Sequence, residues 1–321
     1  MSATPTSPWP RRTAYATVLL ALPLLLLGGT VTTLRVGMAV PDWPTTFGQN
    51  MFTYPLSEML ANGGVFWEHS HRLAGALIGL STIAMVVAHL KYERRSVPRT
   101  LSVVALVAVI AQGVLGGLRV LENSPQLAFL HGSLAQAVFA TMGAIAVMHT
   151  PAYVAAEPRP CKTTVSLRRA AYAAPLVVYA QIVVGAWLRH SGNTIALIVH
   201  FALAVGAAGA VMVLAKRLRI AAEAGDAGGH DRSGLRRVRA WAIGALSAQL
   251  VLGVLAYVWV YLVTGPHNPV SIGEAVFATA HVAVGAFLLI TTVAAVLWSR
   301  RVLATGPRGA ARVGAELGTA R

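Results

Sequence analysis

Four histidines in this sequence each stand a few residues inside the start of a long apolar segment. They are His71, His131, His200 and His281. An ionisable side chain at such a place is costly, so each of the four is a candidate functional residue. Two imidazoles from opposing helices provide the axial ligands of a haem iron, whereas zinc usually takes four tetrahedral nitrogen or sulfur ligands. Four histidines from four separate segments therefore favour two bis-histidine haem sites over a zinc or copper site.

The residues around these histidines form a repeated pattern. Three of the histidines follow a Gln-x-x-x-Gly sequence, at 19, 19 and 32 residues from the Gln. The pairs are Gln112 and Gly116, Gln181 and Gly185, and Gln249 and Gly253. The residues four positions after the four histidines are all small, namely Gly75, Ala135, Ala204 and Gly285. Because residues i and i+4 share a helix face, each small residue leaves room beside an imidazole for a flat group such as a porphyrin.

A charged motif accompanies the first histidine. Glu68 lies three residues before His71 and four before Arg72, so the three side chains share one helix face. A carboxylate beside a haem ligand can accept protons or position water during oxidation of a bound substrate. The alternative is an ion pair between Glu68 and Arg72 that stabilises the start of the helix. Arginines at the same ends of the apolar segments could pair with porphyrin propionates through charge-assisted hydrogen bonds, and these are Arg35, Arg72, Arg119 and Arg189.

Eight apolar segments must position these residues. The 321 residues are 56% hydrophobic and only 12% charged, against about 25% charged in a soluble domain. This composition excludes an ordinary soluble enzyme. A helix needs about 20 apolar residues to cross a bilayer. Segments of this kind lie at about 15–34, 67–90, 101–120, 127–148, 171–189, 195–214, 240–263 and 275–297. We therefore predict an all-α integral membrane protein with eight transmembrane helices.

The positions of the basic residues predict the orientation of these helices. The chain has 26 Lys and Arg against 11 Asp and Glu, and all but the four arginines named above fall in the N-terminus, alternate loops and the C-terminus. Since Lys and Arg near span ends are held in the cytoplasm, both termini are predicted to be cytoplasmic. The positive charge thus reports topology and gives no support to nucleic-acid binding. The repeat predicts two pseudo-symmetric four-helix bundles, residues 1–160 and 161–321.

Together these features resemble the haem A synthase family over about residues 15–297. The resemblance rests on the Glu-x-x-His-Arg motif at 68–72, the Pro-Asp-Trp-Pro sequence at 41–44, the Gln-x-x-x-Gly pairs and the spaced histidines. Members of that family oxidise the C8 methyl group of haem O to the formyl group of haem A, which supplies cytochrome oxidase. Many bacterial members carry two cysteines in the first outer loop, but residues 35–66 contain none. The one cysteine, Cys161, also excludes an intramolecular disulfide.

The resemblance implies a role for each candidate residue. The N-terminal half is expected to bind the substrate haem through His71, His131, Arg72 and Arg119. The C-terminal half is expected to bind haem b through His200, His281 and Arg189. Glu68 is expected to be the catalytic acidic residue near the methyl group. Implied partners are haem O synthase (a protohaem farnesyltransferase), cytochrome oxidase assembly factors, the quinone pool and membrane lipid, in the cell membrane of a prokaryote.

Two other functions are compatible with the residues. A non-catalytic di-haem b carrier that exchanges electrons with quinol would use the same histidines but would not need Glu68. A transporter of a small amphipathic molecule is the second alternative, because internal repeats are common in transporters. Haem content separates the two, since only the carrier would bind haem.

Overall fold

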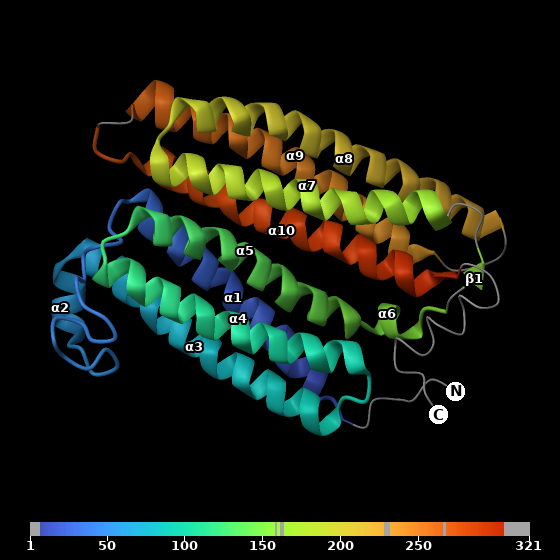
Figure 1. Ribbon diagram of the computed structural model, residues 1–321, viewed down its shortest axis with the longest axis horizontal. Coiled ribbons are helices and arrows are strands. Elements are labelled where there is room, and N and C mark those ends of the chain that lie inside the picture. Colours follow the sequence, from blue (N-terminus) through green and yellow to red (C-terminus); the bar gives the residue numbers. More distant parts are fainter. Residues whose placement is uncertain (1–6, 158, 161–163, 228–231, 266–267, 305–321) are drawn as a thin grey trace.

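The chain folds into long helices that run side by side (Figure 1). The computed structural model describes residues 7–157, 159–160, 164–227, 232–265 and 268–304. Cys161 and part of the basic C-terminus lie outside the described residues. The elements are α1 (Trp9–Thr33), α2 (Leu56–Ala61), α3 (Gly63–Tyr92), α4 (Ser96–Leu121), α5 (Pro125–Met148), α6 (Pro151–Ala155), β1 (Arg159–Pro160), α7 (Thr164–Ser191), α8 (Thr194–Ala227), α9 (Ser233–Tyr257), the π-helical segment η1 (Val258–Thr264), α10 (Ile272–Val302) and β2 (Leu303–Ala304). The two short strands pair in parallel.

Eight helices of the described chain are long and apolar enough to cross a membrane: α1, α3, α4, α5, α7, α8, α9 together with η1, and α10. The chain is therefore an all-α, multi-pass membrane protein, and the eight predicted spans are confirmed. The helices are longer than the predicted spans. The span predicted at 195–214, for example, lies in a helix that continues to Ala227.

Three of the histidine-bearing helices begin at a capping side chain. The Asn62 side chain accepts a hydrogen bond from the Gly64 N–H at 2.9 Å at the start of α3. Ser124 accepts from the Leu127 N–H at 3.2 Å at the start of α5, and Ser271 accepts from the Glu274 N–H at 3.2 Å at the start of α10. Each cap satisfies a backbone donor that the first turn of a helix leaves unpaired. The caps therefore fix the helix starts, a few residues before the histidines.

The helices form two groups. Helices α1, α3, α4 and α5 pack on one another, and so do α7, α8, α9 and α10 (Figure 1). The groups meet where α5 and α1 contact α10 and where α5 contacts α7. Buried residues of α1, α3, α5 and α10 share one apolar cluster at this junction, with Ala21, Ile78, Phe139 and Ala286 among them. Accordingly, α5 and α10 are the most buried of the spans.

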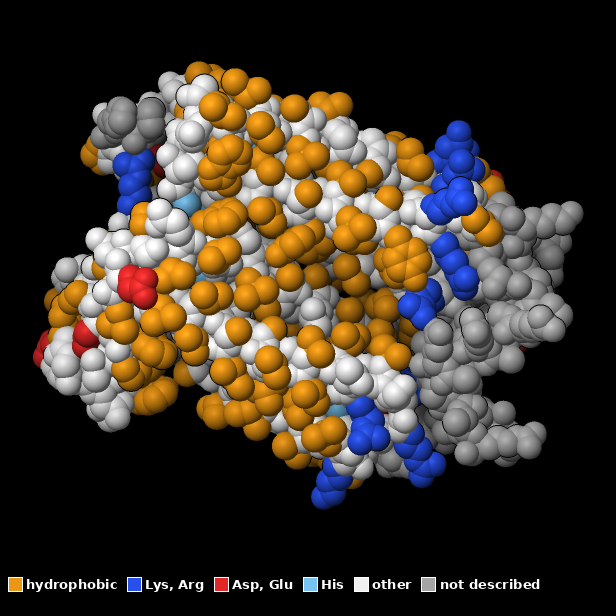
Figure 2. Space-filling model, in the orientation of Figure 1, with side chains coloured by type: hydrophobic (Ala, Val, Ile, Leu, Met, Phe, Trp, Pro, Cys, Tyr) orange, Lys and Arg blue, Asp and Glu red, His pale blue; other side chains and the backbone are white. Residues whose placement is uncertain are grey.

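The outside of the helices suits lipid. Large apolar side chains such as Leu19, Leu80 and Val205 are exposed along them, and Figure 2 shows apolar side chains over most of one face. On that face most Lys and Arg side chains gather at the end where α6 lies, whereas α2 lies at the other end (Figures 1 and 2). We call the end with α2 the outer end, and residues 34–62 the first outer loop.

Candidate functional site

The first pair of candidate histidines lies between helices of the first group, near the outer end. The ring centroids of His71 on α3 and His131 on α5 are 6.4 Å apart, and the ring planes are 89° to each other. Each imidazole lies against a glycine of a neighbouring helix. A Cβ atom at Gly28 of α1 would lie 2.8 Å from His71 Cε1, and one at Gly116 of α4 would lie 3.1 Å from His131 Cε1.

The second pair has the same arrangement in the second group. The ring centroids of His200 on α8 and His281 on α10 are 6.3 Å apart, with the ring planes at 71°. A Cβ atom would lie 2.9 Å from His200 Cε1 at Gly185 and 3.0 Å from His281 Cε1 at Gly253. The structure thus brings the four predicted histidines together as two pairs, His71 with His131 and His200 with His281.

Each glutamine of the sequence pattern contacts the histidine of its own repeat. His131 Nδ1 donates to the Gln112 carbonyl at 3.1 Å, and the Gln112 amide donates to the His131 carbonyl at 3.2 Å. The Gln181 amide makes the equivalent bond to the His200 carbonyl at 3.0 Å. With Nδ1 protonated, His131 Nε2 carries a lone pair that can bind a metal. At His131 the backbone carbonyl of Gln112 therefore selects the tautomer that a haem ligand needs. The Gln249 amide instead lies 3.1 Å from Nε2 of His281.

The spacing of both pairs fits a haem iron. A metal–imidazole bond is about 2 Å long and the nitrogen lies about 1 Å from the ring centroid, so an iron between two opposed imidazoles puts the centroids about 6 Å apart. No side chain of the described residues makes a hydrogen bond to the buried Nδ1 atoms of His71 and His281, and the backbone groups near them are those of Leu24 and Gln249. No group of three or more His, Cys, Asp or Glu side chains that could hold a metal is found in the described part of the chain. The donor set therefore fits two bis-histidine haems better than a zinc site.

Glu68 and Arg72 hold the first outer loop. Glu68 is 1% exposed, and its carboxylate accepts from the Val40 N–H and from Arg72 Nη2, both at 2.9 Å. Arg72 also donates to the carbonyl oxygens of Val40, Asp42 and Thr45. The ion pair that the sequence left as an alternative is therefore present, and it anchors the loop to α3. A carboxylate has about four lone-pair positions, so two acceptor positions of Glu68 remain beside these contacts.

Residues without an assigned role in the sequence strengthen this anchor. His69 is 1% exposed. Its Nδ1 atom lies 3.1 Å from Oγ1 of Thr46 in the loop, within hydrogen-bond distance. The Trp43 indole lies against Gly117 of α4, where a Cβ atom would overlap it. The loop is thus fixed to α3 and α4 and covers the outer end of the first group.

The predicted propionate partners lie in different surroundings. Arg189 of α7 donates to the Gly29 carbonyl at 2.6 Å and to Thr33 Oγ1, both on α1. It therefore joins the two groups of helices. Arg35 lies 4.0 Å from Glu274. Arg119 borders a pocket at the outer end, and no hydrogen bond or ion pair to its guanidinium is found among the described residues.

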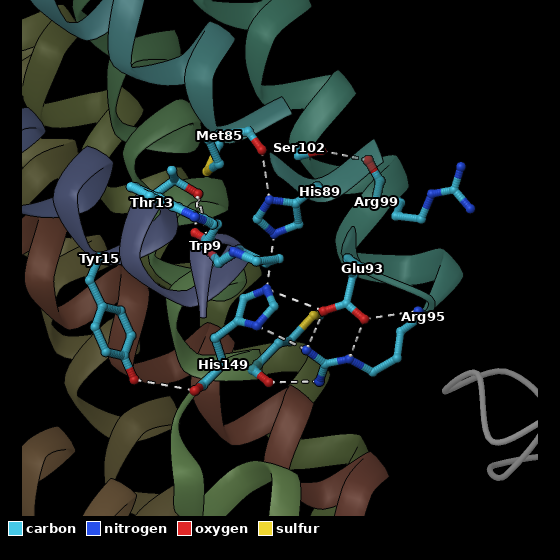
Figure 3. Close-up of polar contacts among 12 residues, drawn as sticks. Trp9, Thr13, Tyr15, Met85, His89, Glu93, Arg95, Arg99, Ser102 and His149 are labelled. Atoms are coloured by element: carbon cyan, nitrogen blue, oxygen red, sulfur yellow. Dashed lines mark hydrogen bonds and ion pairs between the residues drawn. The ribbon is translucent and has the colours of Figure 1, made fainter. Parts of the chain in front are cut away.

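A polar cluster at the opposite end was not anticipated from the sequence (Figure 3). It consists of His89, Glu93, Arg95 and His149, which we call the inner cluster. Arg95 donates to His149 Nδ1 at 2.9 Å and to Glu93 Oε2 at 2.7 Å, and His89 Nδ1 donates to the Met85 carbonyl at 2.8 Å. The 2.9 Å contact between the two Nε2 atoms is then a hydrogen bond from His149 to His89, with both rings neutral.

The charges around the inner cluster maintain this protonation state. Burial, Arg95 and His89 lower the pKa of His149 to about 3. Burial would raise the pKa of Glu93, but hydrogen bonds from Arg95 outweigh this and lower that pKa. The cluster joins the α3–α4 connection to the end of α5. His149 is 60 residues from His89 in the sequence, so only the three-dimensional packing brings it to the other three members.

Comparison with known proteins gives one match to a family. The family described as cytochrome oxidase assembly protein matches residues 11–198, which is more than half of the 321 residues. The matched range contains Glu68, His71 and His131 and ends two residues before His200. No curated protein gives a significant match.

Proposed function

Because this chain belongs to the cytochrome oxidase assembly protein family, we propose that it is a haem A synthase, which oxidises the C8 methyl group of haem O to the formyl group of haem A. The proposal rests chiefly on one observation. Two histidine pairs have ring centroids 6.4 and 6.3 Å apart, and each imidazole lies against a glycine. A non-haem assembly factor would not need such pairs.

The two pairs have separate roles in this proposal. His71 and His131 bind the substrate haem in residues 1–160, and His200 and His281 bind haem b in residues 161–321. Two observations support the first assignment: the loop anchored by Glu68 belongs to the N-terminal half, and the family match includes His71 and His131 but ends before His200. A bis-histidine haem b supplies electron transfer.

The reaction requires an electron acceptor and a proton acceptor. With water as the oxygen source, two successive hydroxylations turn the methyl group into a geminal diol, which loses water to give the aldehyde. The net change adds one water and releases four electrons and four protons. We assign the electrons to the quinone pool through the C-terminal half, and we assign Glu68 as the group that accepts a proton near the methyl group.

The anchored loop gives the N-terminal half a cover. Its contacts with Glu68, Arg72, His69 and Gly117 keep bulk water away from a porphyrin bound below it. Exclusion of water strengthens the electrostatic interactions of a carboxylate with a developing charge. The same residues thus bind the cover and set the surroundings of the reaction.

The proposal includes a location and partners. The protein lies in the cell membrane of a prokaryote with both termini in the cytoplasm, because the basic end of the helices faces inward. Haem O synthase supplies the substrate, and cytochrome oxidase assembly factors receive the product. The haem O farnesyl chain and the lipid-facing helices favour delivery within the membrane.

Glu68→Gln tests the proposed reaction. When the chain is produced together with haem O synthesis, the wild type forms haem A. The Gln variant keeps the shape of the side chain but cannot accept a proton, so haem A falls about 100-fold or more while bound haem is retained. The control is Glu122→Gln, an exposed carboxylate at the same end. Normal haem A from Glu68→Gln would remove Glu68 from the mechanism.

A further inference from the structure

A pocket at the outer end lies between the two groups of helices. Its volume is about 220 Å³, and its lining includes Thr32 and Arg35 at the end of α1, Arg119 of α4, Ala128 of α5 and His190 of α7. Pockets for whole drug-sized ligands have volumes of about 300–1,000 Å³, so this one suits a small group or part of a larger molecule.

The chemistry of the lining favours an anion. Two guanidinium groups and an imidazole border the pocket, together with Ser124 and Pro125 at the N-terminus of α5. None of the described residues that line it is acidic. The N-terminus of a helix adds partial positive charge and backbone N–H donors.

Arg119 is the lining arginine whose guanidinium makes no direct hydrogen bond or ion pair among the described residues, although the charge of Glu68 acts on it. Arg72 donates to Glu68 and the loop carbonyls, and Arg189 donates to α1. Arg35 lies near Glu274. For Arg119, by contrast, no hydrogen bond or ion pair is found within the described chain, and its Nη1 would lie 2.8 Å from a Cβ atom at Gly37. A half-buried guanidinium that makes no direct hydrogen bond to a carboxylate can accept one from a ligand.

The pocket lies about one helical turn outward from the first histidine pair on three helices. Thr32 follows Gly28, which His71 contacts, by four residues on α1. Arg119 follows Gly116, the contact of His131, by three residues on α4. Ala128 precedes His131 by three residues on α5. Three or four residues of helix span about 5 Å.

We propose that this pocket binds a carboxylate, and that the carboxylate is a propionate of the porphyrin held by His71 and His131. Arg119 pairs with it, and His190 donates a hydrogen bond from the other group of helices. His190 Nε2 would lie 3.5 Å from a Cβ atom at Gly132, beside His131, so it already reaches the first group. The inference rests on the proposed haem site of the N-terminal half and adds His190 to it.

The test measures binding of iron protoporphyrin, with and without esterified propionates, to the purified full-length protein. Binding to the N-terminal half is defined as the part that His131→Ala removes. Arg119→Gln should weaken that binding of the free acid about 10- to 100-fold, and His190→Ala about 3- to 10-fold. Neither change should alter binding of the dimethyl ester. Arg94→Gln, the same charge change at an exposed position of the opposite end, is the control.

The outcomes separate this inference from the proposed function. Absence of any His131-dependent binding would refute the haem site itself. His131-dependent binding that ignores Arg119→Gln, His190→Ala and esterification would refute the pocket inference alone. Succinate is the free-anion probe. If it binds the pocket equally well in His131→Ala and does not compete with the porphyrin, the pocket belongs to a free anion and the propionate assignment is wrong.

Discussion

Replacing Gly185 by alanine should release the haem of the C-terminal half while the protein still folds. The new Cβ atom would lie 2.9 Å from His200 Cε1, whereas carbon atoms in contact are about 3.5–4.0 Å apart. The imidazole must therefore move by about 0.6–1 Å. Metal–ligand distances tolerate only about 0.2 Å, so the moved ring no longer reaches the iron position without strain. Without haem the ring can swing aside, which spares the fold.

The size of the effect follows from the cost of overpacking. Forcing an extra methyl group into a packed site costs about 1–3 kcal/mol, and each 1.4 kcal/mol is a factor of ten in affinity. Haem affinity of this pair should therefore fall about 5- to 140-fold. Optical titration of the purified protein, following the six-coordinate low-spin absorbance, measures it. Gly209→Ala in α8 is the matched control, because nothing lies within 4 Å of its Cβ position.

Two results would contradict this reasoning. Unchanged affinity and spectrum in Gly185→Ala would mean that the glycine contact does not position His200. Equal losses in Gly185→Ala and Gly209→Ala would mean that any added methyl group disturbs the helices. The mean elution volume and helix content of both variants should match the wild type, because Gly→Ala favours a helix by about 0.5–1 kcal/mol.

Acid should destabilise the inner cluster. The pKa of folded His149 is lowered to about 3 from about 6.5, and that of Glu93 is lowered as well, so the unfolded chain binds more protons as pH falls below about 6.5. Stability is complete above that pH and falls by up to about 1.4 kcal/mol per pH unit for each extra proton. Thermal unfolding in detergent between pH 7 and pH 5 measures this pH dependence. Stability of the His149→Gln variant should fall less steeply as the pH is lowered. An equally steep fall in the variant and the wild type would refute the assignment. In a second experiment, Gly117→Ala should push Trp43 and the first outer loop outward, and chymotrypsin should cut the loop about 5- to 140-fold faster. Gly113→Ala is the control, because nothing lies within 4 Å of its Cβ position, and its loop should be cut at the wild-type rate. If the loop of Gly117→Ala is cut no faster than that of the wild type, the loop does not depend on the Trp43 contact.

Residue spacing predicted much of the site because helix geometry converts it into contacts. A Gln followed by a Gly at i+4 places both on one face, and His131 and His200 contact both of them. The first hairpin has Leu24 where the others have Gln, so Gly28 was not recognised as the partner of His71. The structure shows that the glycine is common to all four histidines and the glutamine is not.

Contacts between distant segments could not be predicted from spacing. The sequence indicates the outer arginines only as candidate propionate partners, and it does not reveal that Arg189 donates to α1 or that Arg72 holds the loop. Which carbonyl or hydroxyl group lies near a guanidinium depends on how the two helix groups meet. The inner cluster was missed for the same reason, since His89 and His149 carry no local motif.

Helix ends also depended on local chemistry beyond hydropathy. The predicted span at 67–90 becomes a helix from Gly63 to Tyr92, because the Asn62 side chain caps it four residues earlier. The span at 240–263 ends in the π-helical segment at Val258–Thr264. A run of apolar residues predicts the part of a helix that crosses the membrane, but it does not predict where the capped ends of that helix lie.

The haem content of the protein tests the central claim most directly. The wild-type chain is purified after production with and without haem O synthesis, and its haems are extracted and separated. Haem A synthesis predicts haem b in both preparations, with haem O and haem A only where haem O is made. Haem b alone in both preparations, or no haem at all, would contradict the account.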